Sequence, residues 1–308
     1  MLNLPISGKA PDLAAGEWIN SAPLSMQSLK GKVVLIDFWT YSCINCIRTL
    51  PHMNAWQEKY ADKGLVIIGV HTPEFEFEKD YANVKSAVEK YGIKYPVVQD
   101  NNYETWRAYG NSYWPRKYMI DKDGNIRYDH IGEGGYEATE KVIQQLLGVT
   151  GNVTNISDTA PAQSQSPELY LGYEFAIPRG QNLGNPEGFR PETITNYQPA
   201  EVTQGNIIYL SGRWFSAADK IIAVEDAKLR LVYRAKNVNI VAEGANIQVK
   251  LEGFPLPANF AGIDADGSGF VTINEQRLYN IISAPDYMTR MMEIDAQPGF
   301  GLYTFTFG

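Results

Sequence analysis

The sequence predicts an α/β domain followed by an all-β domain, and three observations lead to this fold class. In the first half, short apolar runs alternate with segments of helical spacing. In the second half, polar and apolar residues alternate along several segments. A stretch rich in Gly, Ser, Thr, Asn and Ala lies between them. We therefore expect a first domain over residues 1–148, a linker over 149–166 and a β-sandwich domain over 167–308.

The first domain has the pattern of strands alternating with helices and ending in a hairpin. Apolar runs of four to eight residues are typical of buried strands, whereas apolar residues three or four apart are typical of a helix face. Asp-Lys-Asp-Gly is a strong hairpin turn signal. In chain order we expect strand 33–39, helix 44–60, strand 65–70, helix 79–91, extended segment 95–98, strand 118–120, turn 121–124, strand 126–130 and helix 136–147.

The second domain shows period-two alternation over 228–236, 246–251 and 303–307, separated by Gly, Asn, Asp and Pro. This pattern is typical of antiparallel sheets that bury one face. The domain contains neither Cys nor His, so it is poorly equipped for acid–base or nucleophilic chemistry. We expect it to be a binding or structural module.

Composition excludes several classes of protein. The 308 residues are 44% hydrophobic with a net charge of -8, which indicates a folded protein and no nucleic-acid partner. No apolar stretch reaches the ~18 residues that would span a bilayer, and no signal-peptide pattern opens the chain. We expect either a cytosolic protein or one from which an export or membrane segment has been removed.

The two cysteines, Cys43 and Cys46, form a Cys-x-x-Cys motif where a strand is expected to enter a helix. A zinc site would need two further ligands, and no second such motif exists, so we expect no metal. The free N–H groups at a helix N-terminus stabilise a thiolate, which is the attacking species. We expect Cys43 to be the nucleophile and Cys46 to resolve the mixed disulfide. No cofactor beyond a redox-active Cys43–Cys46 disulfide is expected.

Residues near the motif support this chemistry. Asp37 lies inside the apolar strand, where a carboxylate of raised pKa would be placed to accept the Cys46 proton; a satisfied N–H acceptor at a strand end is the alternative. Pro51 lies inside the expected helix. Trp39 and Tyr41 are expected to face the substrate. Far along the chain, Trp114-Pro115 is expected to place a cis proline opposite the cysteines.

Asp37-Phe-Trp-Thr-Tyr-Ser-Cys-Ile-Asn-Cys46, together with Pro51 and Trp114-Pro115, resembles the thioredoxin superfamily. The opening Gly-Lys-Ala-Pro and the extra segment between residues 70 and 95 are similar to the TlpA/ResA-like redoxin branch. The resemblance implies an acidic residue that approaches the cysteines after the second strand, a position matched best by Glu74, with Glu76 as the alternative. It also implies protein thiols and disulfides as substrates.

The resemblance extends over the whole chain. Segments such as Tyr170-Leu-Gly-Tyr-Glu-Phe175 and Leu229-Arg-Leu-Val-Tyr-Arg-Ala-Lys236 resemble the C-terminal region of DipZ-type proteins. This implies a jelly-roll second domain similar to carbohydrate-binding modules, a periplasmic or extracytoplasmic location tethered to the membrane, and a membrane-embedded CcdA-like electron donor. A glycan partner would stack on aromatic side chains of the second domain, for which the candidates are Tyr170, Tyr173, Trp214, Phe215 and Tyr233.

Two other functions compete with thiol–disulfide exchange. Thr40 precedes Cys43 with the Thr-x-x-Cys spacing of peroxiredoxins, although Ile36 stands where that pattern has proline. The second is a glycan- or envelope-binding protein with a vestigial redox domain. The Ile44-Asn45 dipeptide does not indicate the direction of electron flow.

Residues 264–275 satisfy the spacing of an EF-hand calcium loop. Oxygen donors stand at Asp264, Asp266, Ser268 and Glu275. Gly and Pro upstream disfavour the incoming helix that such a loop needs, and the residues that follow Gly269 read as a strand. We expect a β-hairpin turn here.

Overall fold

The computed structural model describes residues 2–157 and 165–308. The chain divides into two compact units, Met1–Ala160 and Pro161–Gly308. Each unit has its own sheet.

The first unit is built on a seven-stranded sheet of order β1-β7-β6-β3-β4-β5-β2. The central strand β3 pairs in parallel with β4 and antiparallel with β6. The strands expected from the apolar runs are confirmed, whereas the two-residue edge strands β1 and β2 were too short to be predicted. The bounds are β1 Gly8–Lys9, β2 Trp18–Ile19, β3 Val33–Trp39, β4 Leu65–His71, β5 Val97–Gln99, β6 Arg116–Ile120 and β7 Asn125–Ile131.

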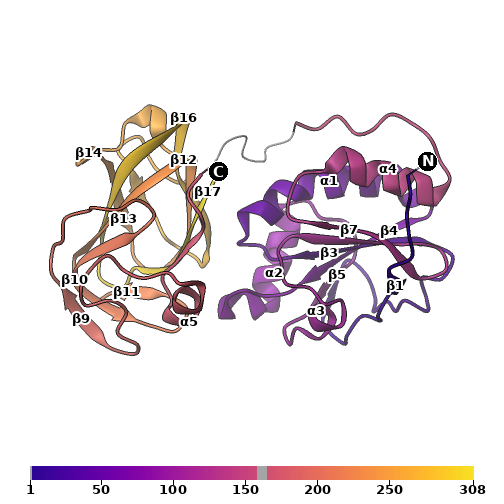
Figure 1. Cartoon of the computed structure of the whole chain (residues 1–308), viewed down its shortest axis with the longest axis horizontal. Coiled ribbons are helices and arrows are strands. Elements are labelled where there is room, and N and C mark those ends of the chain that lie inside the picture. Colours follow the sequence, from indigo (N-terminus) through magenta and orange to yellow (C-terminus); the bar gives the residue numbers. More distant parts are fainter. Residues whose placement is uncertain (1, 158–164) are drawn as a thin grey trace. The chain divides into compact units, whose positions relative to one another are not determined.

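Helices cover both faces of this sheet (Figure 1). Helices α1 and α4 lie on one face, while α2 and α3 lie on the other. Three of these were expected from their spacing, and only the five-residue α3 was not. The bounds are α1 Ile44–Tyr60, α2 Tyr81–Lys90, α3 Glu104–Ala108 and α4 Tyr136–Leu147, with short 3-10 turns η1 Ala61–Lys63 and η2 Glu76–Lys79. This is the α/β thioredoxin-like arrangement that the sequence predicts.

Strand β3 explains where the core lies, because all seven of its residues are buried. Helix α1 covers it with a buried face that includes Leu50, Met53, Trp56 and Tyr60. Pro51 lies inside α1, as expected. Asp37 is therefore an ionisable side chain in the middle of an apolar layer.

The second unit is mostly β, as predicted, and its strands form one connected sheet of order β14-β13-β16-β12-β10-β11-β17-β8, in which β9 also pairs with β10 and β15 also pairs with β13. The long strands β12 and β16 pair along most of their length. On its other edge β12 pairs first with β10 and then with β17. The jelly-roll assignment stays a prediction. The bounds are β8 Leu169–Tyr170, β9 Ile194–Tyr197, β10 Ile208–Ser216, β11 Ile221–Ala223, β12 Ala227–Glu243, β13 Ile247–Leu251, β14 Phe254–Pro255, β15 Phe270–Val271, β16 Arg277–Ala296 and β17 Gly301–Phe307; the short helix α5 Tyr173–Ala176 and the turns η3 Ile177–Arg179 and η4 Ala258–Phe260 complete the unit.

The two ends of the segment expected to be a linker are hydrogen-bonded to the units that they adjoin. Thr154 donates through its N–H to Glu140 of α4 (2.7 Å), so residues just after α4 lie against the first unit. Ser166 donates to the carbonyl of Arg234 (2.8 Å) in the second unit. Residues 158–164 of the expected linker lie outside the described part of the chain.

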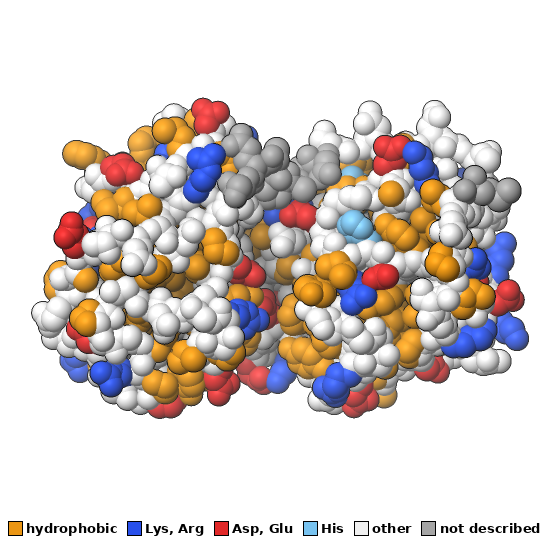
Figure 2. All heavy atoms as spheres, viewed as in Figure 1, with side chains coloured by type: hydrophobic (Ala, Val, Ile, Leu, Met, Phe, Trp, Pro, Cys, Tyr) orange, Lys and Arg blue, Asp and Glu red, His pale blue; other side chains and the backbone are white. Residues whose placement is uncertain are grey.

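On the face shown in Figure 2, basic side chains are interspersed with acidic ones. A nucleic-acid partner would instead require basic side chains gathered on one surface.

Across residues 2–157 and 165–308, no helix is both long and apolar enough to cross a membrane.

Candidate active site

The two cysteines lie where β3 gives way to α1. Cys43 is the N-cap residue of α1 with an extended backbone, and its Sγ accepts the N–H of Cys46 at 3.3 Å. This interaction satisfies one of the free N–H groups of the helix N-terminus. Cys43 is partly exposed, whereas Cys46 is 1% exposed. Cys43 is therefore the cysteine that a substrate can reach, and Cys46 lies behind it.

Asp37 is the buried carboxylate of the site. Burial raises its pKa from 3.8 to about 7, and the nearby Lys117 ammonium opposes this shift. Its Oδ1 has no hydrogen-bond partner among the described residues. Burial also raises the pKa of the Cys46 thiol, with Cys43 and Asp37 adding to the shift. The Cys46 thiol therefore keeps its proton at neutral pH, and Asp37 titrates near neutrality where it can take that proton.

Lys117 is a buried cation that the sequence analysis missed. It lies opposite Asp37 in the β3–β6 register and is 1% exposed. Its Nζ donates to the carbonyl of Gly132 at 3.0 Å. Burial lowers the pKa of Lys117, and the electrostatic influence of the acidic groups of Asp37, Cys46 and Glu133 opposes this shift. A lysine just before the apolar Tyr118–Ile120 run was the available signal, but its partner depends on the strand register.

The Trp114–Pro115 peptide bond is cis. Phe38 pairs with Arg116 in the antiparallel β3–β6 ladder, so Pro115 lies beside the C-terminal end of β3. The chain leaves β3 at this same end to reach Cys43. The Trp114 indole donates to the carbonyl of Thr72 at 3.0 Å, which fixes the segment against the end of β4.

Trp39 and Tyr41, expected to face the substrate, are buried in this structure, and a substrate-facing role for them stays a prediction. Trp39 is 0% exposed and Tyr41 is 6% exposed. The Tyr41 ring stacks on His71 at a centroid distance of 5.6 Å, and Trp39 meets the same ring edge-on. Both side chains point inward from the β3–α1 connection because His71, at the end of the adjacent parallel strand, offers an aromatic surface there.

A different carboxylate from the one expected lies against the cysteine loop. Glu78, at 0% exposed, accepts the Ser42 hydroxyl at 2.5 Å, and Ser42 immediately precedes Cys43. Glu78 also accepts the backbone N–H groups of Glu74 (2.6 Å) and Phe75 (2.9 Å). Glu74 thus meets this network through its backbone, and a catalytic role for its side chain stays a prediction. Glu76 is exposed and pairs with Lys79. Burial raises the pKa of Glu78, and its hydrogen bonds oppose the shift.

Thr40 and His71 extend the same network. Thr40 Oγ1 lies 3.3 Å from His71 Nε2, and the Thr40 hydroxyl also bonds Glu78. Burial lowers the pKa of His71 from 6.5 to about 3, so this ring is neutral. A neutral histidine here can hold Thr40 in place but supplies no charge to the cysteines.

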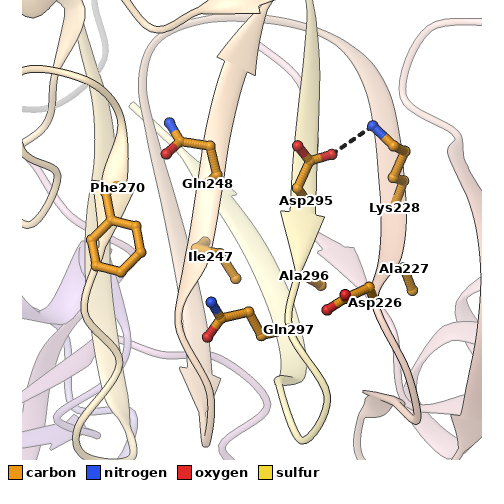
Figure 3. A pocket seen from close by; sticks show the side chains of 9 residues that line it. All are labelled: Asp226, Ala227, Lys228, Ile247, Gln248, Phe270, Asp295, Ala296 and Gln297. Atoms are coloured by element: carbon orange, nitrogen blue, oxygen red, sulfur yellow. Dashed lines mark hydrogen bonds and ion pairs between the residues drawn. The ribbon is translucent and has the colours of Figure 1, made fainter.

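In the second unit, the aromatic side chains considered for glycan stacking are mostly core. Tyr170, Trp214 and Tyr233 are at most 6% exposed. A hollow of about 330 Å³ lies elsewhere, with Phe270, Gln248, Asp295 and Lys228 in one row across four strands (Figure 3). Lys228 and Asp295 are paired at 2.8 Å. Glycan binding stays a prediction.

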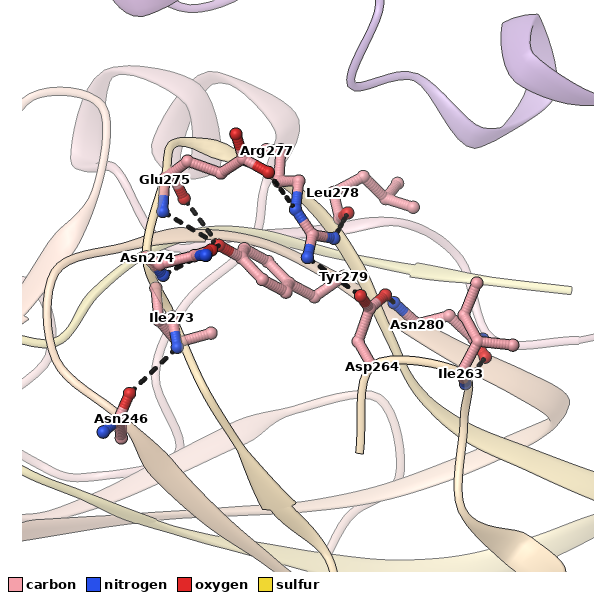
Figure 4. A network of polar contacts seen from close by, with 10 residues as sticks. All are labelled: Asn246, Ile263, Asp264, Ile273, Asn274, Glu275, Arg277, Leu278, Tyr279 and Asn280. Atoms are coloured by element: carbon pink, nitrogen blue, oxygen red, sulfur yellow. Dashed lines mark hydrogen bonds and ion pairs between the residues drawn. The ribbon is translucent and has the colours of Figure 1, made fainter. Parts of the chain in front are cut away.

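The calcium-like loop folds as a tight turn, as expected. Ala265 and Val271 bridge antiparallel, and Asp266 Oδ1 accepts the N–H groups of Ser268 and Phe270. Figure 4 shows that Arg277 lies between Asp264 and Glu275, the first and last oxygen donors of the loop. Its guanidinium pairs with Asp264 at 2.9 Å and with Glu275 at 2.7 Å. Among the described residues, no three His, Cys, Asp or Glu side chains gather to hold a metal.

Comparison with known proteins identifies families for both units. The AhpC/TSA family matches residues 6–129, and a family described as thioredoxin like C-terminal domain matches residues 166–308. Protein DipZ of Mycobacterium tuberculosis is 36% identical over 317 residues, which cover 98% of this chain and 43% of DipZ. The chain therefore spans less than half the length of this relative.

Shorter relatives match the first unit over most of their own length. Thiol-disulfide oxidoreductase YkuV of Bacillus subtilis is 31% identical, covering 43% of this chain and 89% of YkuV. Thiol-disulfide oxidoreductase ResA of Bacillus thuringiensis is 31% identical, covering 46% of this chain and 79% of ResA. The crystal structure of a thiol-disulfide isomerase from Corynebacterium glutamicum is 26% identical with a TM-score of 0.42, and covers 46% of this chain and 98% of that one.

Replacing Asp37 by asparagine is expected to stabilise the reduced protein above neutral pH. The pKa of Asp37 is raised from 3.8 in the unfolded chain to about 7 on folding. Its ionisation therefore costs stability that grows between pH 4 and 7 and is constant above. We expect Asp37→Asn to gain roughly 2 to 4 kcal/mol at pH 8 and nothing below pH 4. Urea unfolding at a series of pH values measures this. Asp62→Asn, at an exposed position, is the control, and an equal gain at pH 4 and pH 8 would contradict the expectation.

Replacing Glu78 by glutamine is expected to destabilise the first unit by about 2 to 4 kcal/mol, because hydrogen bonds to a buried charge are lost and N–H groups are left unpaired. Urea unfolding measures the change. Glu76→Gln is the matched control, since its carboxylate is 77% exposed and should matter by less than about 0.5 kcal/mol. Equal effects of the two substitutions would show that Glu78 does not hold the loop.

Calorimetric titration with calcium is expected to give no isotherm of micromolar affinity. Arg277 already neutralises Asp264 and Glu275, and calcium would have to displace its guanidinium. A saturable isotherm at a molar ratio near one would contradict this geometry.

Proposed function

Because this chain belongs to the thioredoxin superfamily, in the ResA- and DipZ-like redoxin branch, we propose that it is a thiol–disulfide oxidoreductase acting on protein disulfides. One observation carries the proposal. A partly exposed Cys43 caps helix α1, while Cys46 lies buried behind it in the field of Asp37. This arrangement supports one accessible nucleophile and one internal resolving thiol.

The reaction proceeds in two exchanges. The Cys43 thiolate attacks one sulfur of a substrate disulfide, forms a mixed disulfide and releases the other sulfur as a thiolate. Cys46 then attacks the Cys43 sulfur of the mixed disulfide and passes its proton to Asp37. The Cys43–Cys46 disulfide forms, the substrate leaves with two thiolates that take protons from solvent, and two electrons have moved from the protein to the substrate. When the Cys43–Cys46 disulfide is reduced again, Asp37 gives its proton back to the Cys46 thiolate or releases it to solvent.

The setting proposed is the cell envelope, on the extracytoplasmic side. Whole-chain similarity to DipZ supports this, since the resemblance to DipZ-type proteins implies a membrane-tethered region. A CcdA-like membrane protein would restore the dithiol after each cycle. The jelly-roll form of the second unit and a glycan ligand for it belong to the same proposal.

Thiol peroxidase activity is the second candidate, and the AhpC/TSA family match favours it. In that chemistry the Thr40 hydroxyl would polarise a peroxide beside Cys43. Thr40 is 0% exposed and its hydroxyl bonds Glu78 and His71. Because this hydroxyl is engaged inside the protein, the geometry supports disulfide exchange better.

Insulin reduction is expected to require both cysteines but in different ways. Cys43→Ser should reduce activity to the uncatalysed rate, because the remaining thiol is buried. Cys46→Ser should instead accumulate a mixed disulfide with the substrate, visible as a mass increase that dithiothreitol removes. Unchanged insulin reduction by Cys43→Ser would overturn the proposal, and peroxide consumption far faster than insulin reduction would favour the peroxidase.

A further inference from the structure

An ion pair joins the dipeptide between the cysteines to a loop on the neighbouring hairpin. Arg48, in the second turn of α1, bonds Glu133 through two parallel contacts, from Nε to Oε2 and from Nη2 to Oε1, both at 2.8 Å. The same Nη2 donates to Asn45 Oδ1 at 2.7 Å. Asn45 lies between Cys43 and Cys46. The side chains of Arg48 and Glu133 are 12% and 14% exposed, so the pair is largely shielded from solvent.

The loop that carries Glu133 also contacts the other parts of the site. Gly132 donates its N–H to the carbonyl of Pro115 at 2.8 Å, and its carbonyl accepts from Lys117. The Arg48–Glu133 pair therefore connects three segments that surround Cys43: the start of α1, the loop after β7 and the cis-proline segment. Bidentate arginine–carboxylate pairs fix orientation as well as charge.

The pair contacts the residue next to Cys46, so its charge is placed near the cysteines. A cation near a helix N-terminus opposes the helix dipole but stabilises a thiolate there. Arg48 would therefore favour the reduced, thiolate form of Cys43, and a stabilised reduced form makes a strong oxidant. Glu133 cancels this charge. Other ionisable groups at the site are Lys117 and Asp37, which oppose each other in the same way, and Glu78, whose carboxylate holds Ser42 before Cys43.

We propose that Glu133 is a positioning residue that holds Asn45 through Arg48 and keeps the Cys43–Cys46 couple more reducing than an unneutralised Arg48 would make it. The inference rests on the proposed function, because it concerns the redox poise of that site. Removing Glu133 leaves Arg48 unneutralised beside the cysteines. Removing Arg48 leaves the Glu133 carboxylate there instead, with the opposite effect on a thiolate.

The test is the equilibrium of the Cys43–Cys46 disulfide with reduced and oxidised glutathione at pH 7, in the full chain. Glu133→Gln is expected to shift the equilibrium toward the dithiol by at least threefold, which corresponds to about 14 mV. Arg48→Met is expected to shift it at least threefold toward the disulfide. The double variant is expected to return to within threefold of the original chain, as is Arg48→Lys, which keeps the cation.

A matched control comes from the far end of the same hairpin. Asp121 and Arg127 form an ion pair at 2.8 Å with side chains 11% and 27% exposed, and Asp121 directly follows the end of β6 that lies away from Pro115. Asp121→Asn should lower stability without moving the glutathione equilibrium. The inference is overturned if Glu133→Gln and Arg48→Met shift the equilibrium in the same direction, or if both stay within threefold of the original chain.

Failure of the inference and failure of the proposed function are separable. The glutathione equilibrium reports on the two cysteines alone, whereas insulin reduction reports on protein substrates. Opposite shifts in the two variants with no insulin reduction would support the charge pair and overturn the proposed function. Insulin reduction by the original chain, with no shift of the glutathione equilibrium in either variant, would support the proposed function and overturn the charge pair.

Discussion

The first unit depends on how it satisfies carboxylates that water cannot reach. A buried charge is costly unless it is paired and hydrogen-bonded. Glu140 accepts from Trp56, Tyr60 and Lys59, which join α4 to α1. Asp100 accepts two N–H groups at the start of α3, and Glu78 holds the loop before Cys43. Asp37 differs, because its Oδ1 has no partner among the described residues. The carboxylate with an unsatisfied oxygen is the one behind the cysteines, where a shifted pKa would serve the proposed proton transfer.

Much of this site could be predicted because it is local in sequence. Cys43 and Cys46 are three residues apart, and Asp37 precedes them on one strand, so periodicity and helix capping place all three. Glu78 and Lys117 escaped prediction for a physical reason. Glu78 meets Ser42 across 36 residues, and Lys117 meets Asp37 through a strand register that no local pattern fixes. The inward orientation of Trp39 likewise depends on His71, a partner on the adjacent strand.

In the second unit, too, features that are local in sequence could be predicted and those that depend on distant partners could not. Alternation revealed strands in β12, β13 and β17, but the lengths of β12 and β16 depend on their mutual pairing over more than ten residues. The loop over 264–275 shows why a spacing motif needs its context. Two of its oxygen donors, Asp264 and Glu275, pair with Arg277; Glu275 lies two residues before Arg277 in the sequence, but Asp264 comes within reach of it only when the loop folds. A sequence pattern specifies which groups are present, and the fold decides what they bind.

In the reaction proposed above, the difference between the two cysteines sets the order in which they react. Burial raises the pKa of Cys46, so its thiol is a poor nucleophile toward any external disulfide. It becomes reactive only when a mixed disulfide on Cys43 brings an electrophilic sulfur beside it and Asp37 takes its proton. Because the pKa of Asp37 is near 7, this carboxylate can accept that proton and return it within one cycle at neutral pH. Attack by Cys46 is thereby confined to mixed disulfides that have already formed on Cys43. The apolar surroundings of β3 disfavour the ionised form of Asp37, and this raised pKa is what allows the carboxylate to accept the proton.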